Sequence, residues 1–592
     1  MRAVDAIAAW FEEIDVERYF GYAGGAVWPF LDALVDHPEM EGIQAKHESH
    51  AVHMADIYYR TTGRVAPVIV TKGPGLLNCV GGVATAMHDM SAVMVLAGSG
   101  STHLFGKGSM QEIYYHGFED AVSVMRPVTK GAWLAVRPDT IIEVLNQAYK
   151  VATSGRPGPV FVQLPLDVQL GEVEGEIESP KRRLPVSRPR PDAESMSRVV
   201  ELLTNAERPV LLPGGGAVHS PGAAGLVRQV AEQLRIPVAT TLTAKGILDE
   251  THELSLGPVG RSGTPPAAEA TRNADVVLAV GARFSDNHTS NWRSGKIYSL
   301  ERTKIVHVDI DVNEVGRNFP VEVGIAGDAG VFLAELLASV DPDALAARWR
   351  SWTDELVESW SAWRTSIEPL LAAETHPVHP ARICHDVGEA LAAVDGRVFM
   401  DIGDVVQYAE PYMTVRGPGR WHIAPGMAEM GWAASGVLGA VAADPSRPAL
   451  ALTGDGAFNM TSQVLATAVE YQLPAVWVIL DNCEFGIERK GSEKVYERSH
   501  PWYRFARKDT GEPYNPDYAA LARANGADGV RIEDPRKLRP ALDAALAGGK
   551  PFVIDVVQDT SVPTYFTPDI DRAYPSTWGE SYNHHGSLRI KT

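Results

Sequence analysis

The residues best suited to chemistry are Gly454-Asp455-Gly456 and Asp481-Asn482, two short motifs separated by 24 residues. The apolar run PALALT leads into the first motif, the apolar run PAVWVIL leads into the second, and the helical stretch FNMTSQVLATAVEY lies between them. This order predicts two parallel strands joined by a helix. The acid and the amide then lie at the carboxyl ends of strands, which is where open α/β sheets bind ligands.

These residue types suit a phosphate and a metal ion. Glycines let the backbone approach a phosphate closely, and the N-terminus of the following helix offers free N–H groups and the positive end of its dipole. A carboxylate, an amide oxygen and a nearby carbonyl are hard oxygen ligands for Mg²⁺. Gly-Asp-Gly alone also makes an ordinary turn, so the interpretation depends on the spacing and on the closing Asn482.

The two motifs together resemble the signature of thiamine-diphosphate enzymes, in which GDG is followed after roughly 25 to 30 residues by two asparagines. Asp481 departs from the first Asn, and Asn482 matches the second, which binds the metal in that family. The resemblance implies thiamine diphosphate as cofactor, with Mg²⁺ held by Asp455, Asn482 and Glu484. It also implies that the cofactor is contacted by Gly403, Gly454, Asp455, Gly456, Ala457, Asn482, Phe485, Gly486 and Ile487.

A second match lies near the N-terminus. Lys46-His47-Glu48, then HAVHMADIYYRTTGR and VIVTKGPGLLNCVGGVATAMHD, resemble the pyrimidine-binding domain of acetohydroxyacid (acetolactate) synthases. The loop FGYAGGA matches the FGYPGGA of that family, with Ala23 in place of Pro, and the resemblance runs from about Val4 to Asp555. It implies cofactor contacts from Ala23, Gly24, Gly25, Glu48, Pro74 and Asn78.

The resemblance assigns the main catalytic role to Glu48. Its carboxyl group would face N1′ of the aminopyrimidine and favour the imino tautomer, whose nitrogen removes the proton from C2 of the thiazolium. Taken alone, a carboxylate after a histidine is more often a surface helix cap, and only the surrounding motif reverses this.

Three further residues take roles from the resemblance. Met430, in PGMAEMGWAASG, would wedge between the two cofactor rings, although a plain core methionine is the ordinary alternative. Gln111 would reach toward the reacting carbon, and Lys130 would line the substrate side. Asp404 stands where relatives often have Gln; an acid next to a diphosphate is unfavourable unless metal or backbone donors compensate, so we expect it to point elsewhere.

The sharpest departure from acetohydroxyacid synthases is the segment FGIERKGSEKVYERSHPW (485–502), where they carry an apolar, Trp-containing stretch. The segment is locally similar to sulfoacetaldehyde acetyltransferase. We expect Arg489 or Lys490 to face an anionic group on a substrate, because such a pair suits a sulfonate, phosphate or carboxylate. A solvated charged helix face explains the same residues equally well.

Composition narrows the function classes. The chain has 592 residues, enough for three to four domains, and a net charge of −20, which disfavours nucleic acid and anionic membrane as partners. The three cysteines are widely spaced and predict neither a disulfide framework nor a zinc site. The start is an amphipathic helix with acids rather than a signal peptide, and no apolar run approaches 18 residues, so we expect a cytoplasmic enzyme.

The chain predicts an α/β protein of three doubly wound parallel-sheet domains with a C-terminal arm. We expect a pyrimidine-binding domain at 1–175, a linker at 176–192, a central domain at 193–340, a helical linker at 341–378, a diphosphate- and Mg²⁺-binding domain at 379–560 and the arm at 561–592. The central domain matches the region where acetohydroxyacid synthases hold a non-redox FAD. PGGGAV is not the G-x-G-x-x-G fingerprint of dinucleotide binding, so the sequence allows FAD as a cofactor but does not favour it.

The leading interpretation is an acetolactate-synthase-like enzyme that decarboxylates a 2-keto acid and passes the remaining acyl-anion equivalent to an acceptor. Its partners would be small carbonyl substrates and further copies of itself, since the resemblance implies a homodimer or homotetramer with shared active sites. Two alternatives stay open. One is C–S cleavage of sulfoacetaldehyde giving acetyl phosphate, and the other is a flavin-dependent pyruvate oxidase.

Overall fold

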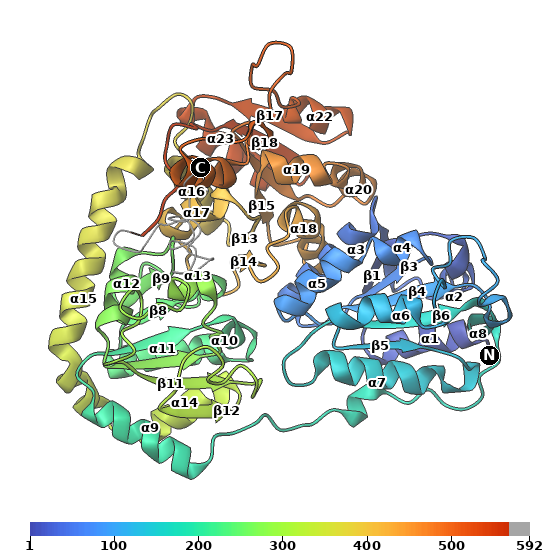
Figure 1. Cartoon of the computed structure of the whole chain (residues 1–592), viewed down its shortest axis with the longest axis horizontal. Coiled ribbons are helices and arrows are strands. Elements are labelled where there is room, and N and C mark those ends of the chain that lie inside the picture. The colour runs from blue at the N-terminus through green and yellow to red at the C-terminus, as the bar shows by residue number, and fades with distance from the viewer. Residues whose placement is uncertain (568–592) are drawn as a thin grey trace, which may run out of the picture.

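Three parallel sheets of six strands each form the core of the protein (Figure 1). The computed structural model describes residues 1–567. All inter-strand pairs within the three sheets are parallel, and helices cover the sheets. The predicted fold class, three doubly wound α/β domains, is therefore confirmed. The exact domain limits expected from the sequence stay predictions, and most of the expected arm, residues 568–592, lies outside the described part of the chain.

The first sheet has the order β2-β1-β3-β4-β6-β5. Its strands are β1 (Arg18–Tyr22), β2 (Glu41–Gln44), β3 (Pro67–Val70), β4 (Met94–Ser99), β5 (Gly131–Leu134) and β6 (Val160–Pro165). Its helices are α1 (Ala3–Glu13), α2 (Trp28–Leu34), α3 (Glu48–Thr62), α4 (Pro74–Leu77), α5 (Val80–His88), α6 (Asp120–Met125), α7 (Ile141–Thr153) and α8 (Leu166–Leu170).

The central sheet has the order β12-β11-β10-β7-β8-β9. Its strands are β7 (Pro209–Pro213), β8 (Val238–Thr240), β9 (Ser255–Pro258), β10 (Val276–Val280), β11 (Lys304–Asp309) and β12 (Val323–Ala326). Its helices are α9 (Ala193–Asn205), α10 (Gly215–His219), α11 (Ala223–Leu234), α12 (Pro265–Asn273), α13 (Asp286–Thr289) and α14 (Ala329–Ser339).

The third sheet has the order β14-β13-β15-β16-β18-β17. Its strands are β13 (Arg397–Met400), β14 (Trp421–Ile423), β15 (Ala449–Gly454), β16 (Val476–Asp481), β17 (Asp528–Ile532) and β18 (Phe552–Val557). Its helices are α16 (Pro380–Ala393), α17 (Asp404–Tyr412), α18 (Trp432–Ala443), α19 (Asp455–Thr461), α20 (Val464–Glu470), α21 (Gly486–Tyr496), α22 (Tyr518–Ala524) and α23 (Leu538–Ala547).

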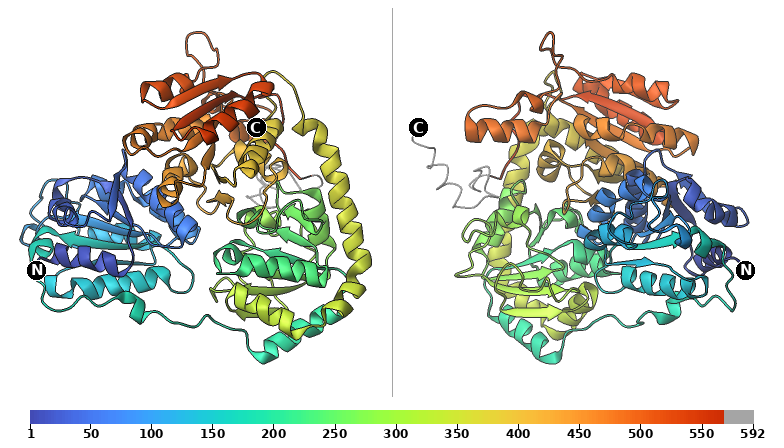
Figure 2. Two further views of the ribbon diagram at one scale, coloured as in Figure 1. Left: turned by 180° about the vertical axis from the view of Figure 1, so that it is seen from behind. Right: turned by 45° about the vertical axis from the view of Figure 1, so that its right-hand side comes forward.

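A long helix, α15 (Pro342–Leu371), runs along the outside of the molecule from the central domain to the third domain (Figure 2). Trp349, Trp352 and Trp360 are buried along it, and the indole N–H of Trp349 donates to the carbonyl of Ala206 at 3.1 Å. The tryptophans therefore form a packed stripe along one side of the helix. No helix in residues 1–567 is long and apolar enough to cross a membrane, and the expected cytoplasmic location stays a prediction.

The first and third domains pack through α3 and α18, which run antiparallel. Trp432 at the start of α18 donates to Asp56 at 2.8 Å, while Gly439, near its end, lies against Met54. A Cβ on Gly439 would stand 2.0 Å from the Met54 carbonyl oxygen, so glycine is what lets the two backbones approach. One buried apolar cluster runs across both domains through this contact.

Candidate active site

Three helices begin at the carboxyl edge of the third sheet and point their N-termini at one place. Asp404 opens α17 after β13, Asp455 opens α19 after β15, and Gly486 opens α21 after β16. The strands are neighbours in the sheet, so the positive ends of three helix dipoles meet there. Such a place suits an anionic group.

Asp455 ties the two sequence motifs together. Its Oδ1 accepts the N–H of Gly456 at 2.7 Å, and its Oδ2 accepts the backbone N–H groups of Asn482 at 3.2 Å and Cys483 at 2.6 Å. The structure therefore brings Asp455 and Asn482 together.

The Asp455 carboxyl lies in an acidic, buried environment. One atom each of Asp455, Asp481 and Cys483 lies within 4.8 Å of the others. Burial, and then the charge of Asp481, raise the pKa of Asp455 to about 7. Buried carboxylates crowded in this way suit a divalent cation, which would neutralise them.

Asn515 contributes to this cluster and was not anticipated from the sequence. Its Nδ2 donates to Asp455 at 2.7 Å and to Asp481 at 2.6 Å. Behind it, the Nη1 of Arg531 donates to Asp481 at 2.8 Å and to Asp555 at 2.6 Å. Asp481, which stands where the family signature has Asn, is thus paired with an arginine that it shares with Asp555.

The side chain of Glu484 faces away from a metal role. Its Oε1 accepts from Nη2 of Arg489 at 2.9 Å, and Arg489 also donates to Glu493 at 2.6 Å. The group that Glu484 can offer a metal is therefore its backbone carbonyl. Arg489 is only 8% exposed and is already paired with two carboxylates.

Asp404 does not point away from the site, which corrects the expectation from the sequence. A Cβ on Gly486 would stand 2.1 Å from the Asp404 Oδ2, so the carboxylate lies against the first residue of α21. The compensation comes from a side chain, since Nζ of Lys490 donates to Asp404 Oδ2 at 2.9 Å. Lys490, like Arg489, is paired within the chain, and the prediction that either faces a substrate anion gains no support from this arrangement.

Met430 and Phe485 lie beside the glycine motif. A Cβ on Gly456 would stand 2.7 Å from a ring carbon of Phe485 and 3.4 Å from Cε of Met430. Two bulky apolar side chains thus border the place where the three helices begin. The wedge role of Met430 stays a prediction.

A second group of predicted residues surrounds Glu48 at the start of α3. Glu48 is 8% exposed and accepts from Nδ2 of Asn78 at 2.9 Å. Pro74 begins the short helix α4 that leads to Asn78. The preceding Gly73 has φ +56°, and a Cβ on it would stand 2.1 Å from the carbonyl oxygen of Gln111. The structure thus gathers Glu48, Asn78, Pro74 and the Gln111 backbone.

The loop with Ala23, Gly24 and Gly25 lies at the carboxyl end of β1. A Cβ on Gly24 would stand 2.5 Å from the Cβ of Thr71, the residue after β3, so glycine is required for this approach.

Lys130 does not lie near this loop or near Glu48. It precedes β5, at the amino ends of the strands, and its Nζ donates to the carbonyls of Ser154 and Arg156 at 2.9 and 2.7 Å. The structure does not bring Lys130 together with Glu48.

Within one chain the two groups are separate. Met430 lies next to the start of α18 and Glu48 at the start of α3, and these helices are antiparallel. The start of α18 packs against the middle of α3, where Trp432 contacts Asp56 and Glu429 contacts His53, while Glu48 is the first residue of α3. The backbone N–H of Gln44, at the end of β2, donates to the hydroxyl of Tyr471, which follows α20, at 3.0 Å.

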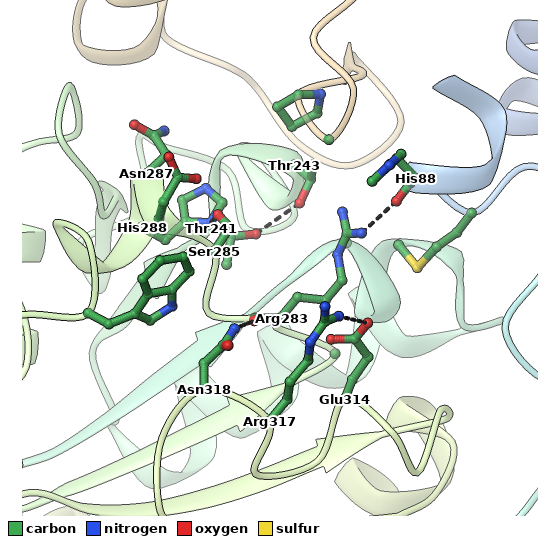
Figure 3. A pocket seen from close by; sticks show the side chains of 17 residues that line it. His88, Thr241, Thr243, Arg283, Ser285, Asn287, His288, Glu314, Arg317 and Asn318 are labelled. Atoms are coloured by element: carbon green, nitrogen blue, oxygen red, sulfur yellow. Dashed lines mark hydrogen bonds and ion pairs between the residues drawn. The ribbon is translucent and has the colours of Figure 1, made fainter. Parts of the chain in front are cut away.

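A separate cavity of about 320 Å³ lies where the three domains meet (Figure 3). Its wall includes His88 of the first domain, Gly426 of the third, and Arg283, Glu314 and Asn318 of the central domain. Glu314 accepts from Arg317 at 3.0 Å, and Asn318 donates to the carbonyl of Phe284 at 3.1 Å. The cavity is polar, carries both signs of charge and opens at the carboxyl edge of the central sheet, a usual ligand position.

Comparison with known proteins agrees with this architecture. Three family descriptions match the chain: "Thiamine pyrophosphate enzyme, N-terminal TPP binding domain" over residues 1–120, "central domain" over 196–336 and "C-terminal TPP binding domain" over 401–556. The chain is 34% identical to the probable acetolactate synthase large subunit of Methanocaldococcus jannaschii, over 94% of this chain and 92% of that protein.

Two bacterial relatives give the same result. The acetolactate synthase isozyme 3 large subunit of Escherichia coli (strain K12) is 32% identical, over 93% of each chain. The acetolactate synthase large subunit of Corynebacterium glutamicum is 32% identical, over 94% of this chain and 87% of that protein. The sequence-based recognition is confirmed: the chain belongs to the acetolactate synthase-like family of thiamine pyrophosphate enzymes.

Proposed function

We propose that the protein is a thiamine-diphosphate- and Mg²⁺-dependent enzyme that decarboxylates a 2-keto acid and joins the resulting acyl unit to a second carbonyl compound, as the names of its relatives suggest. The observation that carries this proposal is the meeting of three helix N-termini at Asp455 and Asn482. When bound, the cofactor supplies a carbanion at C2 and an electron sink for the decarboxylation. The relatives favour neither the sulfoacetaldehyde nor the pyruvate oxidase alternative.

The chain's own residues divide the remaining work. Asp455, Asn482 and the Glu484 carbonyl would hold Mg²⁺, and the N–H groups that begin α19 and α21 would bind the diphosphate. Glu48, shielded and held by Asn78, would share a proton with the aminopyrimidine. Met430 and Phe485 would orient the rings and exclude water.

A second copy of the chain is needed to complete the site. This is supported by the separate surroundings of the two residues within one chain, since Glu48 of the first domain lies beside Asn78 and Met430 of the third domain lies beside Gly456. We therefore propose a homo-oligomer in which the first domain of one copy faces the third domain of another. The arrangement is reciprocal in a two-fold dimer, and it creates two equal sites.

Mixing two inactive variants tests both parts of the proposal. Glu48→Gln and Asp455→Ala would each be inactive as homodimers. If sites are shared, a mixed dimer has one site with both substitutions and one with neither. Co-expressed at equal amounts, the pair should recover about a quarter of wild-type activity, since half of random dimers are mixed and half of their sites are intact.

The matched control mixes a Glu48→Gln/Met430→Ala double variant with Asp455→Ala, and it should not recover this fraction, because the third domain of each copy then carries a change and no site is intact. A mixture of Asp455→Ala with Met430→Ala should recover nothing, because both changes lie in the third domain and every site carries one. No recovery in the mixture of Glu48→Gln with Asp455→Ala would refute the shared site. An absence of thiamine-diphosphate binding by the wild type in calorimetry would refute the function itself.

The substrates are tested by incubating the wild type with pyruvate, 2-ketobutyrate and sulfoacetaldehyde, with and without phosphate. Carboligation products from 2-keto acids are expected, and acetyl phosphate from sulfoacetaldehyde would contradict the proposal. FAD is not part of the proposal, although the polar cavity of about 320 Å³ has room for part of a nucleotide. The visible absorption of the purified protein shows directly whether a flavin is carried.

A further inference from the structure

Two acids lie at a place that must accept a diphosphate. Asp455 would be neutralised by Mg²⁺, but Asp404 has no such role: it opens α17 and lies against Gly486. The carboxylate is 7% exposed, so water screens it little. An uncompensated charge in this position would repel the diphosphate.

Lys490 is built to neutralise this acid. Its Nζ donates to Asp404 Oδ2 at 2.9 Å and to the Tyr408 hydroxyl at 3.0 Å, and it lies 5.5 Å from the centre of the Tyr408 ring. The lysine comes from α21 and Tyr408 from α17, so the contact joins the two helices.

The other carboxylate oxygen is also held. Asp404 Oδ1 accepts from the hydroxyl of Thr564 at 2.8 Å, and the Tyr408 hydroxyl donates to the carbonyl of Val562 at 3.1 Å. Both oxygens of Asp404 are therefore committed to protein donors, and the carboxylate is fixed in one orientation.

Resting on the proposed function, we propose that Lys490 is a positioning residue for the cofactor: it cancels the charge of Asp404 and holds this carboxylate in one orientation at the start of α21. The pair leaves the backbone N–H groups of α21 free for the phosphate oxygens. Arg489, one residue earlier, cannot substitute, since it is committed to Glu484 and Glu493 on another side of the helix.

A double-mutant cycle on cofactor binding tests this proposal. Lys490→Gln removes the cation and keeps a chain of similar length, and Asp404→Asn removes the acid. Calorimetry with thiamine diphosphate at saturating Mg²⁺ measures the dissociation constant, independently of turnover. Lys490→Gln should weaken binding by about tenfold or more, the change expected from one unbalanced buried charge. Asp404→Asn should bind as well as the wild type or better.

The double variant is the deciding one, because it has no acid left to cancel. Its dissociation constant should return to within about threefold of the wild type. Arg382→Gln, which breaks the Arg382–Asp386 pair on α16 of the same domain, is the matched control and should leave binding unchanged.

Two results would overturn the proposal. If Lys490→Gln binds as the wild type does, the cation does not matter. If the double variant is as weak as Lys490→Gln, then Lys490 acts on the cofactor directly and not through Asp404. If the wild type itself binds no thiamine diphosphate, the proposed function fails first, and this outcome is distinguishable because the wild type is measured in the same series.

Discussion

His53 of the first domain and Glu429 of the third lie 3.1 Å apart, Nε2 to Oε2, next to the predicted wedge Met430. The other ring nitrogen of His53 lies 2.7 Å from the hydroxyl of Ser435, and the hydroxyl of Thr85 donates to Glu429 at 2.6 Å. Burial opposes ionisation of Glu429, but its hydrogen bonds with His53 outweigh this and lower its pKa below the usual range. The pair thus fastens the Met430 loop to the first domain.

Glu429→Gln should reduce the free energy of unfolding by roughly 1–3 kcal/mol, because it weakens a hydrogen-bonded pair that is largely shielded from water. Glu389→Gln, at an ion pair that is about one-third exposed, is the control and should change stability by less than about 1 kcal/mol. Denaturant unfolding of both variants, with equal m-values, makes the comparison. Equal losses in the two variants would show that the Glu429 contact has no special weight.

Glu48→Gln should lower turnover by roughly 10²- to 10⁴-fold, because it removes a proton-sharing group without removing packing. Glutamine can still accept from Asn78, so circular dichroism and the melting temperature should match the wild type. Turnover is measured at saturating thiamine diphosphate and Mg²⁺. Near-wild-type turnover under these conditions would sink the catalytic assignment.

Gly439→Ala should destabilise the protein by roughly 3 kcal/mol or more, since the added methyl group would lie 2.0 Å from the Met54 carbonyl oxygen. Gly225→Ala is the matched control: it lies on α11 with nothing within 4 Å of the added carbon. That change should stabilise the protein by about 0.5–1 kcal/mol. Thermal unfolding measures the melting temperature of both variants. Shifts of the same sign in the two melting temperatures would contradict the prediction.

Glu410→Gln should flatten the dependence of stability on pH. Glu410 is fully buried, neither carboxyl oxygen has a hydrogen-bond partner within residues 1–567, and burial raises its pKa to about 8. The folded chain keeps a proton that the unfolded chain has released, so the contribution of this group is full below about pH 4.5 and is lost as the pH rises toward about 8.

The glutamine variant has no such proton to lose. Its free energy of unfolding should therefore rise relative to that of the wild type from about pH 5 to about pH 8, by up to about 1.4 kcal/mol per pH unit for one proton. Chemical unfolding of the wild type and the Glu410→Gln variant at about pH 5 and about pH 8 measures this difference. Parallel pH profiles for the two proteins would mean that Glu410 is ionised or that another group dominates.

Much of the fold could be predicted from residue patterns alone. Runs such as PALALT and PAVWVIL are buried strands because parallel sheets are covered on both faces, and GDG marks a strand end because the chain must turn tightly there. The partners of single side chains could not be predicted. His53 and Glu429 are 376 residues apart, and Lys490 and Asp404 are 86 apart, so only the packing of the helices decides that they meet.

The same limit explains two expectations about charge. The type of Asp404 is visible in the sequence, but the lysine that balances it comes from a different helix. Lys130 matches a family motif, yet it lies at the amino ends of its strands with two backbone carbonyls as partners. A motif fixes which residue is present, and the tertiary structure fixes what that residue faces.

The packing of α3 on α18 sets an order of events during synthesis. About 370 residues separate the end of α3 at Thr62 from the start of α18 at Trp432 (432 − 62). At roughly 5–20 residues per second, the ribosome needs roughly 20–70 s to bridge this gap. During that interval the side of α3 that packs on α18 has no cover from its own chain, which makes the nascent first domain a natural client for chaperones that bind exposed hydrophobic surface.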